Sequence, residues 1–116
     1  MEKEKFYFYD FVICQKIGKK EKELGSAKLL IKFIGDFREN RSLIWDTEKT
    51  DLIIFFDNKY YQFEKPVFCQ SKLANYDSMK SYMTDIKNFI IGFFEDQDKN
   101  FRNLEIQKKD YRFIMF

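Results

Sequence analysis

One segment, from Ser71 to about Glu95, constrains the fold of this chain more than any other. Its apolar residues recur at steps of three and four, the spacing that gathers side chains on one face of an α-helix. These residues are Met79, Tyr82, Met83, Ile86, Phe89, Ile90, Phe93 and Phe94. Polar residues such as Asp85 and Asn88 fall on the opposite face. The spacing therefore predicts one long amphipathic helix over about residues 72–95.

The clearest strand signal lies just before this helix. Residues 51–56 and 60–64 are rich in β-branched and aromatic side chains, and a short polar segment, Asp57-Asn58-Lys59, separates them. Asn tolerates the left-handed backbone that tight turns require, so the pattern predicts a β-hairpin. Leu52 to Phe56 is apolar on both faces, which is typical of a central strand.

The N-terminal half is less sharply patterned. Phe6–Cys14 is aromatic and β-branched and predicts a strand, and residues 42–45 predict a short one. Residues 27–33 alternate apolar and polar, as a half-buried strand does. A helical stripe at Leu24, Ala27, Ile31 and Ile34 fits the same segment, so a helix over 27–34 stays open. The strand is favoured because the glycines at positions 25 and 35 bracket the segment like turn residues.

Beyond the helix, residues 96–100 predict a polar loop. Residues 103–107 and 111–116 predict two strands, with a turn at Lys108-Lys109-Asp110. Strands, one helix and then more strands are typical of the α+β class. We expect an antiparallel β-sheet of about five to seven strands with the helix packed on one face, and residues 1–116 forming a single domain.

Aromatic residues are unusually frequent, with 15 Phe, 7 Tyr and 1 Trp in 116 residues. Each ring can bury about 150–250 Å², which is more than so small a core readily holds. The surplus suggests exposed aromatic surface that a partner covers. The alternative is a codon bias that supplies Phe where Leu would serve.

The side chains that most catalytic and metal sites require are missing from the sequence. There is no His, so Ser-His-Asp triads, Cys-His pairs and most zinc sites are excluded. The two cysteines, Cys14 and Cys69, have no CxxC spacing and sit in apolar contexts, typical of free buried thiols with a raised pKa. A disulfide between them stays open. Neither GxxxxGK[ST] nor GxGxxG occurs, so we expect no cofactor and no metal.

Carboxylates are the one catalytic resource left. The candidates lie in or beside predicted turns: Asp46, Glu48, Asp51, Asp57, Glu95, Asp96 and Asp98. In turns, acidic residues usually serve solvation and capping, so a carboxylate-dependent enzyme is disfavoured without being excluded.

Charge disfavours nucleic acid as a partner. The net charge is +2, and the most basic run, Lys16 to Lys22, is interrupted by Glu21. Phosphate binding needs a basic surplus in one place. The start of the chain, Met1 to Lys5, is charged and lacks a leader pattern, and the apolar stretch after it is about nine residues, short of the roughly twenty that span a bilayer. We expect a cytoplasmic protein without a membrane partner.

A protein that works by contact fits these exclusions best. Tyr and Trp are enriched at interfaces, and here they stand beside acidic turns that would suit a basic partner. The candidate binding residues are Trp45, Asp46, Asp57, Tyr60 and Tyr61.

We expect a small non-enzymatic inhibitor that occludes a larger protein target, either a toxin-immunity protein or a phage-encoded inhibitor of a bacterial defence system. The alternatives are a single-stranded nucleic-acid-binding module, a carboxylate-dependent enzyme or a binder of a small nucleotide signal. Homodimerisation through an aromatic face is compatible with all of them.

Overall fold

The computed structural model describes the backbone of residues 3–37, 43–64 and 76–116. Side chains are described within these ranges except at residues 36, 37, 43–48, 76–79 and 81. The chain forms a five-stranded sheet with one helix, and the elements are β1 Lys3–Ile17, β2 Lys20–Phe37, β3 Leu43–Phe56, β4 Lys59–Glu64, α1 Tyr76–Gln97 and β5 Leu104–Met115.

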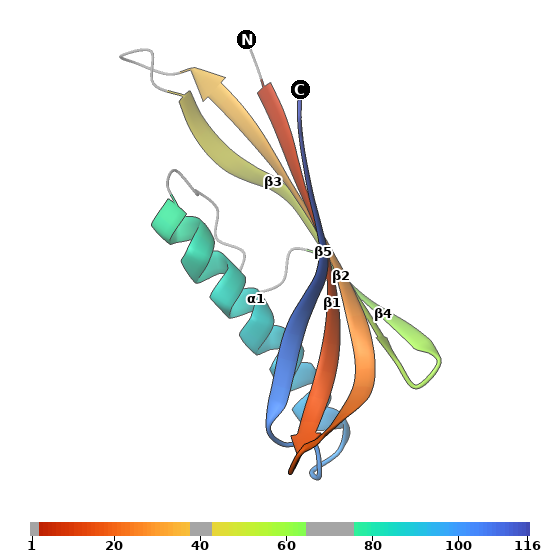
Figure 1. Ribbon diagram of the computed structural model, residues 1–116. Coiled ribbons are helices and arrows are strands. Elements are labelled where there is room, and N and C mark those ends of the chain that lie inside the picture. The colour runs from red at the N-terminus through yellow and green to blue at the C-terminus, as the bar shows by residue number, and fades with distance from the viewer. Residues whose placement is uncertain (1–2, 38–42, 65–75) are drawn as a thin grey trace.

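The strand order across the sheet is β4-β3-β2-β1-β5, and every neighbouring pair is antiparallel. The helix lies along one face of this twisted sheet, and the first residues of β1 lie beside the last residues of β5 at one end of the sheet (Figure 1). The α+β class and the antiparallel sheet with a helix on one face are confirmed. Helix α1 ends two residues beyond the predicted limit of 95, and residues 72–75 of the predicted helix lie outside the described ranges.

The predicted hairpin is present between β3 and β4. Its turn is formed by Asp57 and Asn58, whose φ angles of 53° and 60° are both positive, as a two-residue type I′ turn requires. The β3 strand lies between β2 and β4, so the interpretation of its apolar run as a central strand is also confirmed. The ambiguous segment 27–34 is strand, within β2.

Four predicted turns are wrong, because the strands are longer than the local pattern indicates. The glycines at 25 and 35 lie inside β2, residues 42–45 and 51–56 belong to the same strand from position 43 onward, and 108–110 lies inside β5. Gly25 is required by packing: a Cβ there would collide with the carbonyl oxygen of Phe55 and lie 2.9 Å from Cζ of Phe94. Its missing side chain makes room for the helix and does not break the strand.

A β-bulge replaces the turn expected at 108–110. The pairing of β1 with β5 shifts between Asp10, which lies opposite Asp110, and Phe11, which lies opposite Lys108. Lys109 is the extra residue of the edge strand at this point. Bulges bend a strand and redirect its side chains without ending it, so polar residues alone do not mark a turn.

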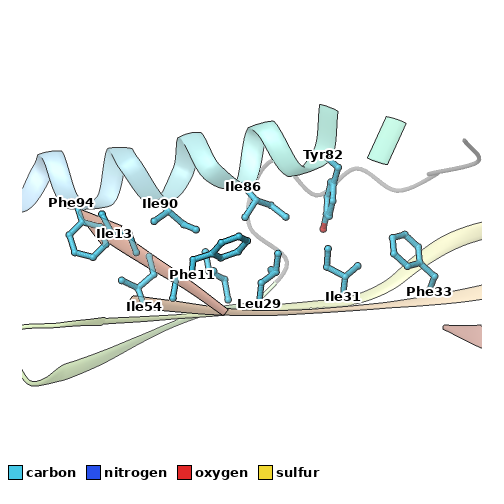
Figure 2. Packing of buried hydrophobic residues seen from close by; sticks show 12 residues of the cluster. Phe11, Ile13, Leu29, Ile31, Phe33, Ile54, Tyr82, Ile86, Ile90 and Phe94 are labelled. Atoms are coloured by element: carbon cyan, nitrogen blue, oxygen red, sulfur yellow. The ribbon is translucent and has the colours of Figure 1, made fainter. Parts of the chain in front are cut away.

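The core lies between the helix and one face of the sheet. Figure 2 shows side chains of α1 pointing toward side chains of β1, β2 and β3 across a single layer. Its buried members are Phe11, Ile13, Ala27, Leu29, Ile31, Phe33, Leu52, Ile54, Tyr82, Ile86, Ile90 and Phe94. One polar contact is enclosed in this layer, between the hydroxyl groups of Thr50 and Tyr82 at 2.5 Å. Among the described residues, the helix thus buries the centre of the stripe that its sequence spacing predicts, at Tyr82, Ile86, Ile90 and Phe94.

Candidate protein-binding surface

The other face of the sheet carries apolar side chains that no described helix or strand covers. Successive residues of a strand point to opposite faces. In the parts of β1 and β2 whose odd-numbered residues are buried under α1, the even-numbered residues therefore point away from the helix. The partly exposed apolar residues of this face, called the open face below, are Phe6, Phe8, Val12, Leu30, Ile34, Ile53 and Phe55. They are joined at the sheet edges by Tyr60, Ile114 and Phe116, which are 76%, 43% and 74% exposed.

These residues form continuous rows across the sheet. Phe8 lies opposite Leu30, and Leu30 lies opposite Asp51 on the next strand. In the neighbouring row Asp10 lies opposite Lys28, which lies opposite Ile53. Cross-strand neighbours on one face are about 4.5–5.5 Å apart at Cβ, so apolar and charged groups lie next to one another over the centre of the open face.

A shallow depression of about 240 Å³ lies at the centre of this face. Its charged lining consists of Asp10, Lys28, Asp51, Asp110 and Arg112. Phe8, Leu30 and Ile53 are among its apolar lining residues. Aromatic and arginine side chains such as Phe8 and Arg112 are enriched at protein interfaces, and charged groups enclosed by apolar surface can select a partner of complementary charge.

Asp51 is the unusual residue of the depression. Its side chain is 15% exposed, and its Oδ2 atom lies 3.2 Å from Nζ of Lys49. Its other oxygen, Oδ1, is buried and has no hydrogen-bond partner among the described residues. A buried acceptor without a donor costs about 1–3 kcal/mol, and more when the group is charged. The Oδ1 atom is therefore a vacant acceptor that a donor from outside the chain would satisfy.

Two more carboxylates lie close to one another in the depression. Asp10 and Asp110 are directly opposite across β1 and β5, an arrangement that destabilises a sheet when both groups are charged. Arg112 partly offsets this repulsion, with its Nε atom 3.9 Å from Oδ2 of Asp110. The guanidinium of Arg112 also lies 6.0 Å from the ring centre of Phe8. The depression thus holds three carboxylates and two basic groups, the second of which is Lys28.

The five residues that the sequence singles out are not brought together. Tyr60 lies exposed on the open face, with its ring 4.9 Å from that of Phe55, and Asp57 is exposed in the β3–β4 turn. Tyr61 points to the helix side and packs edge-on against Phe93 at 4.9 Å. The interpretation of Tyr61 as an exposed binding residue is therefore not supported by its position.

The backbone of Trp45 lies opposite Gly35, and that of Asp46 lies opposite Ile34. Their side chains lie outside the described part of the chain. Because Trp45 is twelve residues before Asp57 along β3, the two are roughly 40 Å apart along the strand.

The residues that line the depression are mostly ones that sequence reasoning misses. Asp51 is the first residue of the strand predicted over 51–56 and one of the candidate carboxylates, but its partial burial depends on a β3 strand that begins eight residues earlier than that prediction. Alternation in residues 6–12 would have placed Phe8 and Asp10 on one face. The pairing of Asp10 with Asp110 depends on a register that no local pattern contains.

The described cysteine, Cys14, is a free and buried thiol. Burial raises its pKa, and a hydrogen bond with Glu21 and the negative charges of Glu21 and Glu23 raise it further. The prediction of a free, buried thiol at this position is confirmed. Cys69 lies outside the described residues.

Comparison of the chain with family models, with curated proteins and with solved structures finds no match. Within residues 3–37, 43–64 and 76–116, no three acidic or thiol side chains are grouped so that they could hold a metal ion. Over the same ranges, no helix has the length and apolar character needed to cross a membrane.

Proposed function

We propose that this chain is a small non-enzymatic protein that binds and occludes a larger protein target through the open face of its sheet. The single observation that carries this proposal is the vacant Oδ1 acceptor of Asp51 in a depression with apolar walls. A buried acceptor without a donor lowers the stability of the free protein, and a donor from a partner would recover that cost in the complex.

The chemistry of the depression favours a basic partner. A lysine or arginine side chain that enters it would meet Asp51, Asp10 and Asp110, while the apolar stem of that side chain would lie along Phe8 and Leu30. A buried, charge-assisted pair enclosed by apolar neighbours is the usual arrangement of an interface hot spot.

The proposal includes two kinds of inhibitor: a toxin-immunity protein and a phage-encoded inhibitor of a bacterial defence system. Both kinds act by covering a target, for which the chain offers a broad sheet face. Action in the cytoplasm belongs to the same proposal. A carboxylate-dependent enzyme gains less support, because Lys28 and Arg112 are interspersed among the three carboxylates of the depression.

The test is co-purification of the tagged chain from the cells that carry its gene, followed by binding measurements with the partner so recovered. The test variant combines Asp10→Asn, Asp51→Asn and Asp110→Asn, which removes the negative charge and keeps the shapes. The matched control combines Asp85→Asn, Asp96→Asn and Asp98→Asn, three exposed carboxylates outside the depression.

We expect the test variant to weaken binding at least about a hundredfold and the control to change it less than about threefold, as charged interface hot spots do. Recovery of the chain without a stoichiometric partner contradicts the proposal. Equal binding by the test variant and the control contradicts it as well.

A further inference from the structure

A groove on the opposite, helix-covered side of the molecule has a different character from the open face. It lies where α1 passes over β1 and the adjoining edge strand β5, and its volume is about 390 Å³. Its lining consists of Tyr9, Phe11, Lys80, Met83, Thr84, Lys87 and Lys108. None of these residues is acidic, although the chain as a whole carries nearly as many acidic residues, 19, as basic ones, 21.

The three lysines come from both walls of the groove. Lys80 and Lys87 are exposed residues of α1, seven positions apart, and therefore lie on the same side of the helix about 10 Å apart along its axis. Lys108 comes from β5, where the bulge at Lys109 places it opposite Phe11. Three ammonium groups around one groove create a local positive potential that the balanced net charge of the chain conceals.

The floor of the groove is apolar. The ring of Tyr9 is only partly buried, and the side chain of Met83 is partly exposed beside it. The ring of Tyr111, over which the Lys108 ammonium lies at 5.4 Å, is 5.0 Å from that of Tyr9 and 43% exposed, so aromatic surface continues outward from the floor. Burial and the neighbouring Tyr111 and Tyr7 raise the pKa of Tyr9 to about 12, so its hydroxyl keeps its proton and can donate a hydrogen bond.

We propose that this groove binds a nucleotide, with its phosphates among Lys80, Lys87 and Lys108 and its base against Tyr9 and Met83. The separation of Lys80 from Lys87 suits a chain of two or more phosphates better than a single one. The hydroxyl of Thr84 donates its proton to the carbonyl oxygen of Lys80 at 3.0 Å, so this proton is not available to a phosphate. The three lysines are the cationic ligands that the groove offers. The ligand can be a free nucleotide or one unit of a single strand, because both present a ring beside phosphate.

This site is independent of the open face, which lies on the other side of the sheet and attracts positive charge. A protein could therefore bind its target with one face and a nucleotide with the other. Failure of the nucleotide proposal would leave the protein-binding proposal intact, and the reverse also holds.

The experiment measures binding of four probes to the full chain by isothermal titration calorimetry at low and moderate salt. The probes are a nucleoside triphosphate, a nucleoside diphosphate, inorganic phosphate and a single-stranded oligothymidylate. The test variant carries Lys80→Glu, Lys87→Glu and Lys108→Glu. The control carries the same change of charge at Lys19, Lys22 and Lys99, which are exposed residues away from the groove.

We expect a nucleotide to bind more tightly than inorganic phosphate, with an affinity that falls as salt rises. Each lysine replaced singly by glutamine is expected to weaken binding about tenfold, the usual effect of losing one hydrogen bond to a charged group. The triple test variant is expected to abolish binding, and the control to change affinity less than about threefold. Folding of all variants is checked by circular dichroism. If the triple glutamate variant fails to fold, the single glutamine variants take its place as the test of the groove.

Tight binding of the free nucleotides identifies the small ligand, and binding of the oligothymidylate without the free nucleotides identifies a strand. Either result, with the loss confined to the groove variants, supports the proposal. The proposal is overturned if no probe binds, if inorganic phosphate binds as tightly as the nucleotides, or if the control loses affinity as the test variant does.

Discussion

The two faces of the sheet are built from the same strands, yet they differ in what they contain. The face under α1 is apolar at its centre, with residues such as Phe11 and Leu29 fully buried and one enclosed polar contact between Thr50 and Tyr82. The open face alternates partly exposed apolar residues with charges, and one of its carboxylate oxygens is buried without a donor. The covered face therefore stabilises the fold, while the open face carries groups that cost stability.

In these strands alternate side chains point to opposite faces, so one set of residues can serve packing while the other serves contact with a partner. Under the helix, buried odd positions of β1 and β2 such as Phe11 and Leu29 can be explained by packing density. On the open face packing explains Phe8 and Leu30 but not the buried Oδ1 atom of Asp51, which has no donor among the described residues. A group that weakens the free protein is a sound basis for locating function, since functional sites are where stability is commonly given up.

The largest expected effect contrasts two phenylalanines of β1 that point to opposite faces. Phe11→Ala removes a ring that is 1% exposed, and the cavity should lower the free energy of unfolding by about 3–5 kcal/mol. Phe8→Ala removes a partly exposed ring and should cost only about 1–2 kcal/mol. Urea denaturation followed by circular dichroism measures both. Similar costs would mean that the open face is covered as the other one is.

The next effect contrasts two glycines near the helix. In Gly25→Ala the new methyl group meets the backbone of Phe55 and the ring of Phe94, and overpacking should cost about 2–3 kcal/mol. In Gly92→Ala the methyl group meets nothing within 4 Å on an α-helix, so this variant should gain about 0.5–1 kcal/mol. The shift of the urea midpoint shows whether each variant is less or more stable than the unchanged protein. A tolerated Gly25→Ala would contradict the close approach of the helix to β2.

A smaller effect tests the enclosed polar contact on the covered face. Thr50→Val and Tyr82→Phe each remove one of two hydroxyls that lie 2.5 Å apart, and each should cost about 1–2 kcal/mol. The double variant should cost less than the two single costs added together, because the hydroxyls act on one another. Additive costs in this double-mutant cycle would show that the two groups are energetically independent.

The smallest effect on stability is expected at Asp51. Asp51→Asn loses a partly exposed ion pair with Lys49 and relieves a buried charge, so the free energy of unfolding should change by less than about 1 kcal/mol. Asp51→Leu should leave stability unchanged or raise it by up to about 1 kcal/mol. Thermal and urea unfolding give the measurement. A loss above about 2 kcal/mol in either variant would show that Asp51 serves the fold.

The sequence predicts what depends on local periodicity. The helical stripe from Tyr82 to Phe94 identifies α1 and its buried face, and Asp57-Asn58 identifies the β3–β4 turn, because both signals lie within a few residues. Strand ends are predicted poorly, since Gly25 satisfies a packing need set by Phe94, which lies far away along the chain. Both surface sites depend on register and helix placement. The opposition of Asp10 to Asp110 and the approach of Lys80 to Lys108 are decided by tertiary structure.

The bulge in β5 has a consequence for how these molecules behave when they are crowded together. An outer strand offers a row of backbone donors and acceptors to which a strand of another chain can add, which is the first step toward aggregation. At Lys109 the regular spacing of these backbone groups is interrupted, and the side chains of Lys108 and Lys109 place two positive charges there. A second molecule approaching this edge therefore meets an interruption within β5, which disfavours pairing of strands along its full length.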